Sequence, residues 1–267
     1  MNRILRYSTA NYQSLLRDNS THLFAQHHAL RLYKANAIYS FIPKNACSTL
    51  RLSLAMANGC VQHKKDFNWI HQNNATFVAD LASLLTAEYT FVVLRCPYAR
   101  LASAFLDKLA GHTSEAWQLY DTLEREREVS SVSFEYFIKQ LKKPKIKNSN
   151  IHWRPQIDFL VYQDYDDYFA LENFSQAIKR LKEVIGLSVV DARDLTHHGI
   201  DKLTLLGGLG DFTTLSAVEI LQLKQAGQCP SPVSLYNDEL ITIVNNCYKA
   251  DIKLYKNLFG SSQLLFA

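Results

Sequence analysis

Apolar residues gather in two short runs, each of which leads through a tight loop into an amphipathic segment. The first run, residues 37–42 (AIYSFI), is rich in β-forming residues and is ended by Pro43, so it predicts a buried strand. After the loop, Ser48 or Thr49 can cap a helix with apolar residues at helical spacing, which Gly59 ends. This region therefore predicts a strand, a loop and a helix in succession.

The second run begins a unit of the same kind. Residues 90–94 (TFVVL) predict another buried strand, Pro97 suits the first turn of the following helix, and Gly111 stops that helix. A further strand is expected at residues 159–162. Strands that alternate with helices favour a mainly parallel sheet with helical crossovers, and thus an α/β fold.

The remaining segments have helical character. Residues 1–34 predict a helical, partly polar lead-in, and residues 112–150 predict a charged helical region. Within the latter, the alternating charges of residues 124–128 (ERERE) predict an exposed helix face. Amphipathic spacing also predicts three later helices, at residues 174–185, 215–226 and 239–258.

The composition is that of a globular protein. The chain has 267 residues, of which 48% are apolar and 20% charged, and this excludes a disordered or low-complexity chain. Because we find no repeat and no long linker, we expect one domain over residues 1–267. The most apolar stretch, residues 77–94, contains Asp80 and Glu88, and the N-terminal residues lack the apolar core of a secretory signal. We therefore expect a cytoplasmic protein without a membrane span.

The balance of charge and the cysteines narrow the possible ligands. Lys and Arg total 29 and Asp and Glu total 25, a formal net charge of +4, which allows an anionic ligand but falls short of a dedicated nucleic-acid binder. The five cysteines form no C-x-x-C pair and have no zinc-ligand spacing. We expect reduced thiols and no bound metal.

One candidate anion site is the loop before the first predicted helix. Lys44 lies in this loop, and the free N–H groups and positive dipole at a helix start attract anions. Ser48 and Thr49 add hydroxyl donors, and Arg51 lies within the first turn. Nucleotide kinases use the same physics with G-x-x-x-x-G-K-[ST], but this loop contains no glycine. By itself, the string is equally compatible with an ordinary helix start.

A second candidate anion site follows the second predicted strand. Arg95 comes directly after that strand, where side chains emerge at the carboxyl edge of a parallel sheet, and Ser103 lies about two helical turns further on. An arginine offers a planar pair of donors to phosphate oxygens, and a serine adds a compact donor. The alternative is structural: Arg95 pairs with a buried carboxylate, and Ser103 packs as a small residue.

Taken together, the two segments resemble the nucleotide site of sulfotransferases that use 3′-phosphoadenosine 5′-phosphosulfate (PAPS). In that family a P-K-x-x-x-[ST] loop, here residues 43–48, binds the 5′-phosphosulfate. An R-x-P-x-x-R-L-x-S-x-[FY] segment, here residues 95–105, binds the 3′-phosphate through its first arginine and its serine. Cys96 stands where the family more often has Asp or Asn, which leaves the second helix less well capped. The resemblance implies donor contacts from Lys44, Asn45, Ala46, Cys47, Ser48, Thr49, Arg51, Arg95 and Ser103.

Three stretches are similar to the carbohydrate sulfotransferase branch of this family. Residues 43–48 match its P-K-x-A-C-[ST], residues 151–160 contain its H-W-x-P-Q, and residues 248–255 match its Y-x-x-D-x-x-x-[FY]. The resemblance implies a P-loop-like, three-layer α/β/α fold with a mainly parallel central sheet. It also implies metal-independent, in-line transfer of a sulfuryl group from PAPS to a hydroxyl of a carbohydrate or glycoconjugate. Animal members of the branch are generally membrane-anchored, whereas this sequence shows no apolar anchor. We therefore expect a bacterial cytoplasmic enzyme.

The resemblance also implies roles at the reaction centre. Lys44 would stabilise negative charge on the leaving oxygen and the sulfuryl oxygens, and a histidine would act as general base. His71 matches the usual place of the base, shortly before the strand of the second motif. His152 is the main alternative, and a carboxylate or another histidine is a further one. His152, Trp153 and Arg154 would contact the acceptor, unless Trp153 is a core residue.

Two other functions remain open. A nucleotide-dependent, kinase-like phosphotransferase would also use an anion loop, although the glycines and an obvious magnesium-binding aspartate are missing. A non-catalytic module that binds anions or glycans would use the same positive charge without chemistry, with a steep dependence on salt. The basic residues 142–147 fit either the attraction of an anionic acceptor or a solvated loop.

Overall fold

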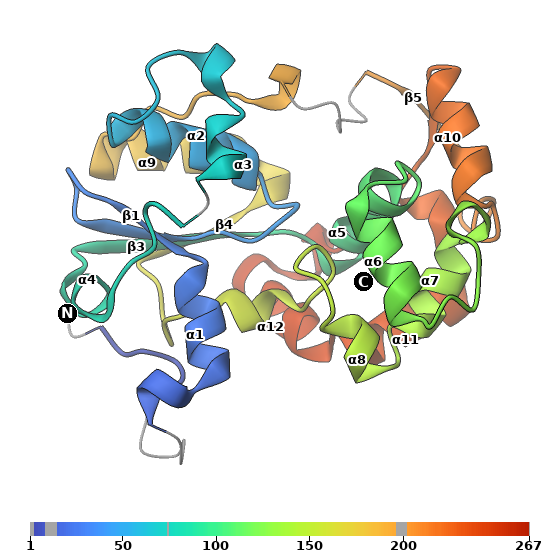
Figure 1. The fold of residues 1–267 in the computed structure, drawn as a ribbon, viewed down its shortest axis with the longest axis horizontal. Coiled ribbons are helices and arrows are strands. Elements are labelled where there is room, and N and C mark those ends of the chain that lie inside the picture. The colour runs from blue at the N-terminus through green and yellow to red at the C-terminus, as the bar shows by residue number, and fades with distance from the viewer. Residues whose placement is uncertain (1–2, 9–14, 74, 196–201, 267) are drawn as a thin grey trace. The chain divides into compact units, whose positions relative to one another are not determined.

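The computed structural model describes residues 3–8, 15–73, 75–195 and 202–266. The chain folds into two compact units, each made from two separate stretches (Figure 1). Unit 1 comprises residues 1–95 and 156–197, and unit 2 comprises residues 96–155 and 198–267. Whether the two units form one domain depends on how they associate, so the expected single domain over residues 1–267 stays a prediction.

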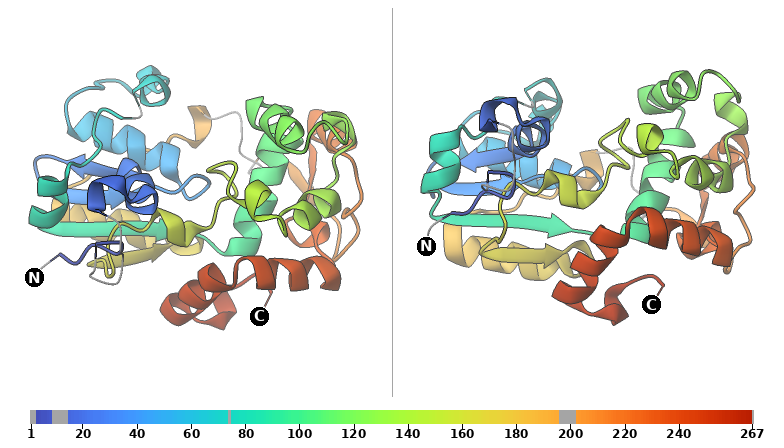
Figure 2. Two further views of the ribbon diagram at one scale, coloured as in Figure 1. Left: turned by 60° about the horizontal axis from the view of Figure 1, so that its bottom comes forward. Right: turned by 90° about the horizontal axis from the view of Figure 1, so that it is seen from below.

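Unit 1 is built on a four-stranded sheet in the order β1-β2-β3-β4. Strand β1 pairs antiparallel with β2, whereas β2 with β3 and β3 with β4 pair in parallel (Figure 2), so the predicted mainly parallel sheet is confirmed. Every residue of β3 is buried, as expected for a central parallel strand that is covered on both faces. The strands are Ala29–Leu32 (β1), Ala37–Ser40 (β2), Tyr89–Leu94 (β3) and Asp167–Ala170 (β4).

Helices cover both faces of this sheet. On one face lie α2 (Cys47–Ala57) and α9 (Phe174–Ile185), and on the other lies α1 (Ser20–His27) (Figure 1). The rings of Tyr39 in β2 and Phe91 in β3 stack 4.9 Å apart, in the apolar core that they share with α2 and α9. The three layers confirm the predicted α/β/α architecture. The shorter helices of unit 1 are α3 (Trp69–Gln72) and α4 (Leu81–Thr86).

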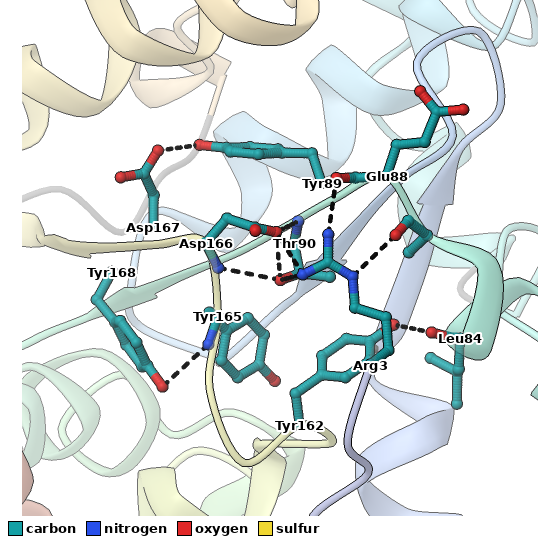
Figure 3. Close-up of polar contacts among 11 residues, drawn as sticks. Arg3, Leu84, Glu88, Tyr89, Thr90, Tyr162, Tyr165, Asp166, Asp167 and Tyr168 are labelled. Atoms are coloured by element: carbon teal, nitrogen blue, oxygen red, sulfur yellow. Dashed lines mark hydrogen bonds and ion pairs between the residues drawn. The ribbon is translucent and has the colours of Figure 1, made fainter. Parts of the chain in front are cut away.

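An arginine from the N-terminal segment is clamped at the start of β3 (Figure 3). Arg3 donates to the carbonyls of Ala87 (2.8 Å) and Glu88 (2.7 Å) and pairs with Asp166 at 2.7 Å. Asp166 also accepts from the backbone N–H (2.7 Å) and the hydroxyl (2.9 Å) of Thr90. These contacts tie the N-terminal segment to the amino end of β3, so the loops that carry the predicted anion sites lie at the opposite, carboxyl end.

Unit 2 is mainly helical. Its core is aromatic: the ring of Phe134 lies 5.3 Å from that of Phe105 and 4.8 Å from that of Tyr236. A small parallel sheet pairs β5 (Thr204–Leu206) with β6 (Gln228–Pro230). Nowhere in the described residues is a helix both long and apolar enough to span a bilayer. The helices of unit 2 are α5 (Pro97–Ala104), α6 (Ser114–Thr122), α7 (Phe134–Gln140), α8 (Pro144–Lys147), α10 (Ala217–Gln225), α11 (Asp238–Cys247) and α12 (Lys249–Phe259).

Two predictions in unit 1 were wrong about where a strand lies. The end of the expected helical lead-in is β1, because its pairing with β2 extends the sheet by one antiparallel strand. Residues 159–162 do not form the expected strand: residues 156–159 make a 3-10 turn, and the third parallel strand is β4. The periodicity of a short apolar run does not by itself show whether the run forms a strand.

Two predictions in unit 2 were also wrong. The charged run 124–128 follows α6 as an exposed turn instead of a helix face, with φ of 56° at Glu124 and 64° at Arg125. The last expected helix is two helices, α11 and α12 (red in Figure 2), which break at Tyr248. Tyr248 leaves helical geometry (φ −118°, ψ 26°), and its hydroxyl donates to the carbonyl of Trp153 at 2.6 Å.

Candidate functional site

The loop that follows β2 adopts a strained conformation without glycine. Lys44 (φ 72°) and Ala46 (φ 56°) both lie in the left-handed region, which costs about 1–2 kcal/mol for each residue that carries a side chain. Backbone strain of this kind is concentrated at functional sites. The loop therefore keeps a specific shape at the expense of local stability.

Helix α2 begins without a side-chain cap. Ala46 is its N-cap residue and no side chain caps the helix, so the prediction that Ser48 or Thr49 caps it was wrong. The left-handed turn at Ala46 starts the helix at Cys47 and places both hydroxyl groups in the first turn. The N–H groups of a first turn have no partner within the helix. The start of α2 thus offers backbone donors and the positive end of the helix dipole to an anion.

The side chains of this first turn differ in exposure. Cys47 and Ser48 are half-buried. Thr49 is 7% exposed, and its hydroxyl accepts from the N–H of Ala192 at 3.3 Å. Thr49 therefore also anchors the segment that follows α9, whereas Ser48 is the more accessible hydroxyl beside the loop.

A buried glutamine joins this loop to the end of β3. Asn45 is fully buried, and its Nδ2 donates to the carbonyl of Val93 (2.9 Å) and to Oε1 of Gln156 (2.6 Å). The same Gln156 oxygen accepts from the N–H of Arg95 (3.0 Å), and Gln156 Nε2 donates to the Arg95 carbonyl (2.8 Å). Gln156, itself 2% exposed, thereby fixes the loop and Arg95 relative to each other within unit 1.

The lysine and the arginine predicted to bind the donor's anions lie against each other in unit 1. Nη1 of Arg95 donates to the carbonyl of Lys44 at 3.1 Å. Strands β2 and β3 pair in parallel, which brings their carboxyl ends to one edge of the sheet. This edge therefore gathers an uncapped helix start, a lysine and an arginine, and all three favour an anion.

Arg51, a further predicted donor contact, is engaged inside unit 1. It is 9% exposed, it donates to the carbonyl of Ile70, and its guanidinium carbon lies 5.2 Å from the centre of the Phe41 ring. These contacts connect α2 to α3. His71, the first candidate for the base, lies in α3, where its side chain is exposed and its ring meets that of Phe67 edge-on at 5.1 Å.

In unit 2, the second arginine of the R-x-P-x-x-R motif holds the H-W-x-P-Q segment. Arg100 is 2% exposed and donates to the carbonyls of Arg154 (2.7 Å) and Ile151 (3.0 Å). Because these two carbonyls lie on either side of His152 in the chain, α5 fixes the turn that carries this histidine.

Trp153 is a core residue of unit 2. It is fully buried, and its indole N–H donates to the carbonyl of Ile146 at 2.9 Å. The structure thus favours a packing role for Trp153 over contact with an acceptor. Since the hydroxyl of Tyr248 binds the Trp153 carbonyl, the Y-x-x-D segment also meets the H-W-x-P-Q segment here. The other predicted site residues of unit 2 are each partly exposed, namely Ser103, His152 and Arg154.

Three organising residues were missed by reasoning from the sequence, namely Arg100, Gln156 and Tyr248. Each lies inside a motif that the sequence displays, but spacing does not reveal which motif positions contact one another. For Arg100, which lies between Ala99 and Leu101, the available signal was its chemistry: a polar side chain among apolar residues has to find hydrogen-bond partners when it is buried. No such apolar surroundings mark Gln156 or Tyr248 in the sequence.

Replacing Gln156 by leucine is expected to destabilise unit 1. The variant removes the partner of the Asn45 amide and of the Arg95 N–H and carbonyl, at about 1–3 kcal/mol for a buried group that stays unpaired. We expect a lower urea midpoint with an unchanged m-value. Gln163→Leu, at an exposed glutamine of the same unit, should leave the midpoint nearly unchanged, and equal shifts in both variants would contradict the role of Gln156.

Comparison with known proteins is consistent with this geometry. A largely parallel sheet with an uncapped helix start and two cations at its carboxyl edge is suited to an enzyme that holds a phosphate-bearing ligand. The chain belongs to the sulfotransferase family, because the profile described as Sulfotransferase family matches residues 27–257. The protein is therefore a transferase that acts on sulfuryl groups. No curated protein and no solved structure matches the chain. Among the described residues, no group of three or more His, Cys, Asp or Glu side chains could hold a metal ion.

Proposed function

We propose that the protein transfers a sulfuryl group from PAPS to a hydroxyl of a carbohydrate or glycoconjugate acceptor, in line and without a metal ion. Membership of the family supports sulfuryl transfer as the reaction. The observation that carries the choice of donor is the carboxyl edge of the sheet in unit 1. There the uncapped start of α2, Lys44 and Arg95 lie together.

The residues of this edge fit an anionic nucleotide donor. The first-turn N–H groups of α2 and Lys44 would hold the 5′-phosphosulfate, with Ser48 as a further donor. Arg95 and Ser103, which match the family's 3′-phosphate motif, would hold the 3′-phosphate. When bound, the donor supplies the sulfuryl group and a phosphate leaving group. Lys44 would then place its positive charge where negative charge develops on the leaving oxygen.

A carbohydrate acceptor is supported by the motifs that resemble the carbohydrate branch. Two of them, the H-W-x-P-Q and Y-x-x-D segments, are joined in unit 2 by the hydrogen bond from Tyr248 to Trp153. His152 and Arg154, which are partly exposed, would contact acceptor hydroxyls, whereas the buried Trp153 packs beneath them.

Thermal unfolding with nucleotides tests the choice of donor. We expect 3′-phosphoadenosine 5′-phosphate (PAP) to raise the unfolding temperature more than ATP or AMP does, since a ligand at about 100 times its Kd stabilises a protein by about 2.7 kcal/mol. Arg95→Ala and Ser103→Ala should each remove the advantage of PAP over AMP, because they lose donors to the 3′-phosphate. Arg17→Ala, at an exposed arginine of unit 1, should keep it.

Other outcomes of the same experiment would favour the other functions. Equal stabilisation by ATP and PAP would overturn the PAPS proposal and favour a kinase-like phosphotransferase. Equal and steeply salt-dependent stabilisation by every polyanion would favour a non-catalytic binding module. Incubation with sulfur-labelled PAPS and a panel of glycans then tests the acceptor, and a panel that stays unlabelled would contradict the carbohydrate part of the proposal.

A further inference from the structure

Four titratable side chains of unit 2 lie close together. Glu115 Oε1 is 3.4 Å from Lys108 Nζ and 3.7 Å from His152 Nδ1. Asp107 Oδ2 is 3.7 Å from the same lysine nitrogen. The side chains of Asp107, Lys108, Glu115 and His152 are 5%, 14%, 15% and 16% exposed. Their charges therefore interact with less screening by water than charges on an open surface.

The backbone of unit 2 is shaped to form this cluster. Helix α5 runs into a π-helical turn, Phe105–Leu109, which carries Asp107 and Lys108. Such turns are frequent at functional sites. The chain then bends at Gly111, where a Cβ would lie 2.3 Å from the carbonyl oxygen of Asp107. Only glycine fits this bend, which places Glu115, in the first turn of α6, next to Lys108.

Hydrogen bonds around Asn150 set the tautomer of His152. Asn150 Nδ2 donates to Oε1 of Gln118 at 2.8 Å, which orients the amide. Its Oδ1 accepts from the backbone N–H of His152 (2.9 Å) and lies 2.8 Å from the ring Nδ1. An amide oxygen only accepts hydrogen bonds, so Nδ1 carries a hydrogen. In the neutral ring Nε2 is then the basic nitrogen.

The carboxyl group of Glu115 is ionised at neutral pH. Burial acts to raise its pKa, but the hydroxyl of Thr113, which donates to it at 2.6 Å, and the charges of Lys108 and His152 outweigh burial and lower the pKa to about 2. This electrostatic interaction is mutual. The charged ring of His152 favours the ionised carboxylate of Glu115, and that carboxylate in turn favours the protonated ring.

Other charges surround His152 on each side. Lys108 and Asp107 come from the π-helical turn, and Arg154 follows in the same chain segment. Arg100 reaches the carbonyls on either side of the histidine. Lys108, Arg100 and Arg154 oppose a positive charge on the ring, whereas Asp107 and Glu115 favour it. Glu115 is the carboxylate that lies within 3.7 Å of the ring nitrogen Nδ1.

From this geometry we infer that Glu115 is a positioning residue for His152, whose Nε2 takes the proton of the acceptor hydroxyl. The inference rests on the proposed function. The hydroxyl oxygen forms a bond to sulfur while the bond between sulfur and the donor's phosphate oxygen breaks, and the electron pair of that bond goes to the phosphate oxygen. The proton ends on Nε2, and Glu115 stabilises the resulting imidazolium from the Nδ1 side. His152 is also better shielded from water than the exposed alternative, His71.

The first readout needs no substrate. Nitrogen NMR of the histidine rings reports the tautomer and the protonation of His152, whose signal is assigned by its loss in His152→Ala. We expect the Nδ1-protonated tautomer in the wild type and in Glu124→Gln, the matched control at an exposed carboxylate of the same unit. In Glu115→Gln the ring should lose its proton at a lower pH, because the neighbouring negative charge is gone.

The second readout is turnover. Glu115→Gln should lower kcat by about 10²-fold, at the lower end of what a general base contributes, and leave KM for PAPS unchanged. The acid limb of its pH–rate profile should move to lower pH together with the NMR titration. His152→Ala should lose turnover while it still binds PAP, and Glu124→Gln should behave as the wild type.

Each contrary result has a separate meaning. The same His152 titration in Glu115→Gln as in the wild type, or full turnover in that variant, would overturn the positioning role. Unchanged turnover in His152→Ala would overturn His152 as the base and favour His71. A wild type that transfers no sulfuryl group would overturn the proposed function, whatever the NMR result. Should Glu115→Gln fail to fold, Lys108→Met should let the ring keep its proton to a higher pH, and no shift would overturn the inference.

Discussion

Replacing Lys44 by alanine is expected to lower the rate of sulfuryl transfer by about 10²–10³-fold, the usual loss when one donor to a developing negative charge is removed. The loop places Lys44 next to the uncapped start of α2, and the Lys44 carbonyl accepts from Arg95. In the proposed function the charge of Lys44 acts on the anion held there. Alanine shares the steric limits of lysine at positive φ, and we therefore expect the fold of the loop to survive. Steady-state kinetics with labelled PAPS measures the effect.

The control for this variant is Lys34→Ala, at an exposed lysine of the same unit. It removes one positive charge from unit 1 without touching the loop, so a rate close to that of the wild type is expected. Comparable losses in the two variants would mean that net charge, and not the place of Lys44, determines the rate. Full activity of Lys44→Ala would remove the loop from the reaction.

The second large effect concerns stability. Trp153→Ala should destabilise the protein by about 3–5 kcal/mol, the usual loss for a large aromatic side chain in a core. Trp153 is fully buried and its ring lies 5.5 Å from that of Phe137. Because domains are stable by only about 5–15 kcal/mol, the variant should unfold at a much lower urea concentration, followed by circular dichroism.

Trp117→Ala is the matched comparison, since this tryptophan of unit 2 is 53% exposed. A surface substitution of this kind changes stability by no more than about 0.5 kcal/mol. A Trp153→Ala variant as stable as Trp117→Ala would contradict the core assignment. It would return Trp153 to the group of residues that contact the acceptor.

The central strands of unit 1 could be predicted because buried parallel strands leave nearly unbroken apolar runs in the sequence. Residues 37–42 contain β2 and residues 90–94 lie in β3, and Pro97 occupies the first turn of α5. The amphipathic segment 174–185 is α9 to the residue. Strand β1 was missed because its four residues become a strand only through pairing with β2.

Less of the candidate site could be predicted. Arg95 was assigned to the carboxyl edge of a parallel sheet and Lys44 to the loop after a neighbouring strand, and the hydrogen bond from Arg95 to the Lys44 carbonyl brings the two segments together. Their binding of PAPS stays a prediction. Contacts between distant segments were out of reach, such as that of Asn45 with Gln156, which are 111 positions apart. The Glu115 cluster depends on a π-helical turn, for which the sequence has no periodic signal.

The two hydrogen bonds between Gln156 and the backbone of Arg95 have a consequence for the chain topology. The chain leaves unit 1 after Arg95 and returns at Gln156, and the side chain of Gln156 bonds both the N–H and the carbonyl of Arg95. The exit and re-entry points are thus neighbours, so residues 96–155 have the topology of an insertion between two adjacent ends, which chains tolerate well. A short glycine-rich bridge from Arg95 to Gln156 would close the gap, and unit 1 could then be expressed as one continuous polypeptide.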